Sequence, residues 1–280
     1  MASPTPLPWA DQPYALLATP PQNAHSATIC AYEMTMAHNL FIRSTNSILL
    51  QAPHISDSTT PATYNPDDVK DILYYTSAFL KTVDHHHHVE ETVTFPLLAA
   101  VPGVPSGFLD PPVEQHRGFH DGVVELQMYC TKHLADADGW RWAEMKRIID
   151  AFAPALMSHL TDEVEMLLKL EPLCESAAVW QCWQATEKAA LNDARFSNLY
   201  DVFPCGLGSS DRSFEGGNKF PPAPAVLIYA VQYWGAKRCE RPGAWRFCPS
   251  DFWGRPRELV FLREVREREE AKVAEQGATS

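Results

Sequence analysis

The chain has 280 residues, of which 23 are Lys or Arg and 35 are Asp or Glu, so its formal net charge is −12. Nucleic acids and anionic membrane surfaces repel so acidic a protein, and the sequence predicts neither as a partner. Hydrophobic residues make up 45% of the chain, which excludes a disordered protein and allows a sizeable core. No apolar run approaches the roughly 18 residues needed to span a bilayer.

The N-terminus and the cysteines both favour a cytoplasmic protein. Residues 1–22 are rich in proline and lack the basic and apolar regions of a signal peptide, so we expect an N-terminal arm there. The seven cysteines are odd in number and scattered, with no C-x-x-C pair. Such a set is typical of reduced thiols in the cytoplasm.

Four long segments have the 3.6-residue periodicity of amphipathic helices. They cover residues 24–50, 66–99, 112–135 and 140–170. Asn65 is a suitable N-cap for the second helix and Pro66 fits its first position, whereas Pro154 should kink the fourth. Because short or proline-rich loops join these segments, the sequence predicts an all-α protein in which residues 23–172 form an antiparallel four-helix bundle.

The remaining residues, 173–280, form an extension of different texture. Helices are expected at about 177–194, 225–234 and 258–275, with irregular, Gly- and Pro-rich or aromatic segments at 204–224 and 245–256. Five of the eight tryptophans lie in this extension. We expect it to pack on the bundle, where it either shapes a pocket or lid or only buries more surface.

Histidine and glutamate recur at four-residue spacing on the apolar faces of the predicted helices. Residues at i and i+4 are neighbours on one helix face, so each pair can point two donor groups at the same place in the bundle interior. The pairs are His86/Glu90, His116/His120 and His159/Glu163, and the first helix adds His38. The predicted metal ligands are therefore His38, His86, Glu90, His116, His120, His159 and Glu163.

Each of these histidines alone is more often a hydrogen-bonded core residue than a ligand, and each glutamate can pair with a histidine in a buried ion pair. Seven such groups on four interior faces would nevertheless make a very polar core, which bound cations explain. Imidazoles mixed with carboxylates suit iron, manganese or zinc. Seven ligands exceed one tetrahedral zinc site and fit two ions bridged by Glu90 and Glu163.

The register of the second helix has an alternative, because His87 and Glu91 have the same spacing as His86 and Glu90. We prefer the latter pair, which shares its face with Val83 and other apolar residues. His87 is then expected to be exposed or outside the ligand shell. Histidines without a partner at ligand spacing are expected at the surface; they are His25, His54 and His133.

The order of these motifs resembles the hemerythrin-like (HHE cation-binding) family. Residues 86–91, HHHVEE, followed by Phe95-Pro96, look like the family's HHxxEE…FP segment, and residues 159–163 look like its HLxxE segment. The resemblance covers about residues 30–170. It implies a non-haem diiron centre with an oxygen bridge, held by the seven ligands named above, that handles dioxygen at an open coordination position.

One departure bears on function. Glu163 follows His159 at i+4, whereas the oxygen-carrying members use a longer-spaced aspartate, so the sequence resembles the broader hemerythrin-like group. A carrier needs no pocket for an organic molecule, and the long extension therefore favours an enzyme. We expect a diiron protein that activates dioxygen to oxidise a small organic substrate. The alternative is reversible dioxygen binding, or redox, nitric oxide or iron sensing, without turnover.

Overall fold

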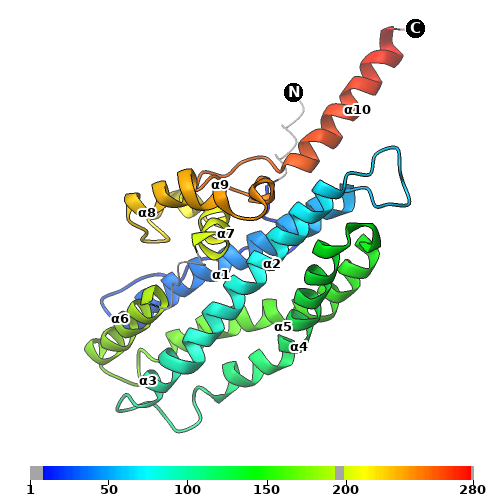
Figure 1. Cartoon of the computed structure of the whole chain (residues 1–280). Coiled ribbons are helices and arrows are strands. Elements are labelled where there is room, and N and C mark those ends of the chain that lie inside the picture. Colours follow the sequence, from blue (N-terminus) through cyan, green and yellow to red (C-terminus); the bar gives the residue numbers. More distant parts are fainter. Residues whose placement is uncertain (1–8, 193–198, 279–280) are drawn as a thin grey trace.

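Four long helices form an antiparallel bundle in the computed structural model, which describes residues 9–192 and 199–278 (Figure 1). They are α1 (Ser26–Gln51), α2 (Pro66–Val89), α4 (Asp110–Ala135) and α5 (Trp142–Leu168). Within those ranges the only β pairing is an isolated bridge between Ser250 and Pro256. The predicted all-α fold class is confirmed. α5 continues through Pro154 as one helix.

The helix starts follow from local chemistry. The Asn65 side chain accepts a hydrogen bond from the Asp67 N–H at 3.1 Å, and Pro66 occupies the first helical position of α2, as predicted. The ring of His25 caps α1 by accepting from the Ala27 N–H, and its other nitrogen lies 2.9 Å from the Cys174 carbonyl oxygen. His25 is therefore a helix cap that joins two segments, and not the free surface residue that we expected.

α2 continues through a π turn, Glu90–Thr94, into the short helix α3 (Phe95–Ala99). The Phe95 N–H donates to the Glu90 carbonyl, five residues earlier. Pro96 explains the wide turn, because it has no N–H to give and in a regular α-helix its ring would collide with the carbonyl of Thr92. The π turn thus allows the helix to continue from the histidine-rich segment past Pro96 without a break.

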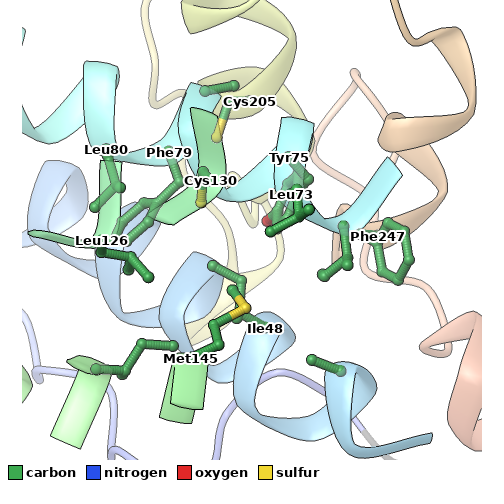
Figure 2. Packing of buried hydrophobic residues seen from close by; sticks show 14 of the residues in the cluster. Ile48, Leu73, Tyr75, Phe79, Leu80, Leu126, Cys130, Met145, Cys205 and Phe247 are labelled. Atoms are coloured by element: carbon green, nitrogen blue, oxygen red, sulfur yellow. The ribbon is translucent and has the colours of Figure 1, made fainter. Parts of the chain in front are cut away.

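Two apolar cores fill the bundle, one toward each end. The larger contains Phe79, Leu126, Met145 and Ile48, one from each long helix (Figure 2). The smaller lies under α6 (Ser176–Asn192) and contains Met34, Phe95, Val164, Val179 and Trp183.

The histidines lie between the two cores. On α1, His38 falls between Met34 of the smaller core and Phe41 of the larger. On α5, His159 and Glu163 fall where residues of the larger core give way to those of the smaller. The fold therefore places a buried polar layer across the bundle, with apolar packing above and below it.

The extension contains α6, α7 (Val202–Ser209), α8 (Ala225–Ala230), a π turn at Val231–Gly235, α9 (Ala236–Arg238) and α10 (Val260–Ala278). The predicted helices at 177–194 and 258–275 correspond to α6 and α10, except that 193–194 lie outside the described residues. α7 occupies a segment predicted to be irregular. Its start is capped by the Asp201 carboxylate, 2.7 Å from the Val202 N–H, and Pro204 is tolerated in the first turn.

The extension packs mainly on α1 and α2 and shares the larger core. Phe247 is fully buried, with its ring stacked on Phe261 at 5.2 Å and 6.3 Å from Tyr75 of α2. Cys205 of α7 joins the same cluster (Figure 2). Across the two described ranges, no helix is both long and apolar enough to cross a membrane.

Candidate metal centre

The polar layer is supplied by all four long helices. His38 and His159 are completely buried, and Glu90 and Glu163 are each 1% exposed. His116 and His87 retain 4% and 8% exposure, and the His86 side chain retains 19%, so these three border the outside of the layer. Burying so many ionisable groups is costly unless a charge partner shares the space.

The side chains form two groups that could each hold a cation. In each group the potential ligand atoms all lie within 4.8 Å of one another. We call them the first group, His38, His86, Glu90 and Glu163, and the second group, His87, Glu90, His116 and His159. Glu90 belongs to both.

Both glutamates contact histidines of the two groups, although Glu163 is a member of the first group only. Glu90 Oε1 lies 2.7 Å from His86 Nε2 in the first group, and Glu90 Oε2 lies 3.7 Å from His116 Nε2 in the second. Glu163 Oε2 lies 3.2 Å from His38 Nε2 and 3.6 Å from His159 Nε2. Each carboxylate is thus in a position to bridge a pair of ions.

The chemistry of the donors fits cations better than internal hydrogen bonding. His116 Nε2 faces His159 Nε2 at 3.1 Å, and His38 Nε2 faces His86 Nε2 at 3.4 Å. Neither carboxylate oxygen of Glu90 or Glu163 accepts a well-aligned hydrogen bond from the described residues. Lone pairs that converge in a dry space without donors are the arrangement that a metal ion satisfies.

Outer contacts orient three of the imidazoles. His38 Nδ1 donates to the Leu160 carbonyl at 2.7 Å, His116 Nδ1 lies 2.7 Å from Glu91 Oε1, and His159 Nδ1 lies 3.3 Å from Gln115 Oε1. A proton held at Nδ1 leaves Nε2 free to bind a metal. These contacts therefore turn the Nε2 lone pairs toward the polar layer.

Burial also fixes the protonation states. It lowers the pKa of His86 to about 4 and that of His159 to about 3, so both rings are neutral, which is the form that binds metals. Burial raises the pKa of Glu90 well above its usual value, and Glu163 raises it further. Burial also acts to raise the pKa of Glu163, but contact with His38 outweighs it and brings that pKa to about 2. Cation binding would displace the proton from Glu90.

The structure brings together six of the seven predicted ligands and leaves out His120. His120 is exposed and belongs to neither group. The inward position on α4 is taken by Phe119, whose ring lies 5.2 Å from that of His87 and 5.5 Å from that of His159. The physical reason is the rotation of α4, whose buried face runs through His116, Phe119 and Val123.

His87 is the residue that the sequence interpretation missed, and the expectation that it lies outside the ligand groups is wrong. It is buried, and its ring lies 4.2 Å from that of His116. Leu73 and Leu80 precede it at seven-residue spacing and are both buried, which was the available signal. His86 and His87 both face the polar layer, while Glu91 contacts His116 from outside.

Of the other histidines, His54 is exposed as expected, whereas His133 is not. His133 is 1% exposed and packs against the ring of Tyr129 at 4.4 Å. Its Nδ1 lies 3.2 Å from the Asp136 carbonyl, so it fastens the loop after α4.

A cavity of about 500 Å³ opens beside the second group. Its lining comes from α2, the π turn that follows it and α4, and includes His87 and His116. None of the described residues of the extension is among the lining residues, so this cavity differs from the pocket or lid that the extension was expected to shape.

Comparisons with known proteins agree with this geometry. The family model "Hemerythrin HHE cation binding domain" matches residues 32–170, which contain every member of both groups. The chain is 37% identical over 261 residues to the "Dimeric xanthone biosynthesis cluster protein R11" of Cryptosporiopsis sp. (strain 8999), a match that covers 91% of this chain and 93% of the relative. No solved structure matches the chain.

The family match, the helical bundle and the two histidine–glutamate groups lead to the same result. The chain belongs to the hemerythrin HHE cation-binding domain family.

Proposed function

We propose that the chain is a non-haem diiron protein that binds and activates dioxygen to oxidise a small organic molecule. The observation that carries this proposal is the pair of four-residue groups that share Glu90. Five imidazoles and two carboxylates are a donor set that suits iron. The ligands in this proposal are His38, His86, His87, Glu90, His116, His159 and Glu163.

Two iron ions held there would supply dioxygen binding and the electrons for its reduction. The residues of the chain supply the rest. Glu90 and Glu163 keep both groups in register and balance positive charge in a dry space. Phe41, 5.0 Å from His86, covers the first group with an apolar ring, and Phe119 packs against His116 at the apolar floor of the cavity. Exclusion of water strengthens the electrostatic interactions within the layer.

Two observations support an organic substrate. The cavity of about 500 Å³ reaches His87 and His116 of the second group and is large enough for a small molecule. The relative from Cryptosporiopsis is named for a cluster that makes dimeric xanthones, which are organic compounds. We infer that this chain likewise acts on a small molecule of a biosynthetic pathway.

The test begins with metal analysis of protein purified without a histidine tag. About two iron ions per chain are expected, and His88→Ala, which removes an exposed imidazole of the histidine run, should leave that number unchanged. A content far below two ions in the parent protein would overturn the diiron proposal.

The second step mixes the reduced protein with dioxygen in a stopped-flow instrument. Rapid and irreversible consumption of dioxygen, accelerated by substrate, supports an oxidase or oxygenase. A coloured species that disappears under vacuum and restores the starting spectrum would instead establish reversible binding. A conformational change without consumption of dioxygen would establish a sensor.

A further inference from the structure

The cavity beside the second group has two tiers of lining residues. The inner tier is apolar apart from its metal-facing imidazoles and is formed by Val83, His87, His116, Phe119 and Val123. The outer tier is polar and comes from the exposed sides of the same two helices. It consists of Asp84, His88, Glu91, Arg117, His120 and Asp121. A ligand in this cavity therefore meets an apolar floor and a polar rim.

Most of the polar rim is free to bind a ligand. Among residues 9–192 and 199–278, the side chains of Asp84, Asp121, His88 and His120 engage no hydrogen-bond or ion-pair partner. Glu91 is occupied by His116. The Arg117 guanidinium donates through Nη1 to Glu114 at 2.9 Å. The free groups are thus carboxylates, which only accept hydrogen bonds, and imidazoles, which accept or donate one.

The charge of the rim selects against anions. Three carboxylates face one guanidinium, and that guanidinium already has a partner. A ligand that carries a carboxylate or phosphate would be repelled at this opening. A ligand with O–H groups would instead donate to Asp84 and Asp121, and such hydrogen bonds to charged acceptors are the stronger kind.

We propose that this cavity binds a neutral, flat ring compound that carries hydroxyl groups, with its ring face on Val83, Phe119 and Val123 and its hydroxyls at Asp84 and Asp121. The ring would lie against His87 and His116, next to the second group. The proposal names the substrate class and so rests on the proposed function, but binding itself needs no metal.

The cavity volume is consistent with one to three fused rings, because drug-sized ligand sites span about 300–1,000 Å³. A suitable probe is 2,6-dihydroxynaphthalene, whose hydroxyls lie too far apart to chelate one ion and stay neutral near pH 7. Two controls keep the ring and change the polar groups: 2,6-dimethoxynaphthalene cannot donate, and 2-naphthoate is an anion.

Binding is measured by fluorescence titration of each probe with the metal-free and the iron-loaded protein. We expect the dihydroxy compound to bind at least about tenfold more tightly than either control in both forms. Equal binding of the dimethoxy compound, or tighter binding of the naphthoate, would overturn the proposal. Failure to find iron or dioxygen turnover would contradict the proposed function but would leave the result with metal-free protein standing, so the two failures are distinguishable.

The rim residues are tested by Asp84→Asn and Asp121→Asn. Each should weaken the dihydroxy compound about five- to tenfold and leave the dimethoxy compound unchanged. Glu144→Gln is the matched control, because it removes an exposed carboxylate of α5 outside the cavity and should change neither affinity. If the Asp variants lost affinity equally for the dihydroxy and the dimethoxy compound, the carboxylates would not be accepting hydrogen bonds from the hydroxyls, and the proposal would be contradicted.

Discussion

The two flanks of α2 differ in what covers them. One flank, toward α1, lies under the extension, where Phe247 and Cys205 complete the larger core. The other flank, toward α4, borders the open cavity of about 500 Å³. The second group borders this cavity, whereas the first group lies toward α1, where the His86 side chain keeps 19% exposure. The comparison teaches that the extension adds apolar core to one flank of α2, whereas the other flank keeps a cavity beside the second group.

The largest test of this comparison is Glu90→Ala, because Glu90 is the one described residue that belongs to both groups. We expect bound iron to fall from about two ions per chain toward zero, since both groups lose a carboxylate. Metal analysis after gel filtration measures this. Glu114→Ala, which removes an exposed glutamate, should retain full iron. Retention of two ions by Glu90→Ala would contradict a shared ligand.

The next test compares the iron-binding roles of two histidines that both line the cavity between α2 and α4. His87→Ala should remove about one ion per chain by emptying the second group, whereas His120→Ala should keep both ions because His120 lies outside the groups. Iron content and the spectrum of the remaining ion distinguish the outcomes. Loss in His120→Ala with retention in His87→Ala would restore the ligand set predicted from the sequence.

The flank of α2 under the extension is tested by Phe247→Ala. Removing a fully buried ring from the shared core should lower the free energy of unfolding by about 3–5 kcal/mol, as measured by urea denaturation. Val226→Ala in the same extension is the control; Val226 is 75% exposed and should cost less than about 0.5 kcal/mol. A single, equally small effect for both would mean that the extension does not contribute to the core.

The smallest effect is expected for Glu91→Gln on the open flank. Glu91 orients His116 through Nδ1, and loss of its charge should weaken iron in the second group about tenfold without altering the first. Removal of iron by a competing chelator, followed as two separate phases, measures the iron affinities of the first and the second group. Equal weakening of both phases would show a general loss of structure instead of a positioning role.

Most of the bundle could be predicted from the sequence because its signals are local. The cap at Asn65 and Pro66 and the apolar periodicity depend on neighbouring residues only. They gave both ends of α1 within two residues and the start of α2 at Pro66, whereas the predicted end at residue 99 is the end of α3. α7 was missed because Pro204 and two glycines are typical of loops. α7 forms because it is buried against Cys248. The contact is so close that a Cβ atom added at Gly208 would lie only 2.4 Å from the Cys248 Sγ, so only glycine fits there.

The ligand register could be predicted only in part, because helix rotation depends on what packs on each side. α2 is buried on two faces, since the extension covers one and the bundle the other, so the stripe through Leu80 and the stripe through Val83 both contain buried apolar residues. Periodicity alone could not decide between His86 and His87, and both face the layer. On α4 the exposure of Val124, four residues after His120, shows which side faces solvent.

The π turn at Glu90–Thr94 allows the continuous helix formed by α2 and α3 to supply both metal-ligand candidates and apolar core residues. Upstream of it the helix presents His86, His87 and Glu90, and downstream it presents Phe95 and Leu98 to the smaller core. Each residue of an α-helix advances the side-chain direction by about 100°. Deleting one residue here would swing the downstream half away from its apolar partners. The π turn therefore sets the rotation of the helix after it, so that the ligand-bearing residues before it and the apolar residues after it both face the bundle interior.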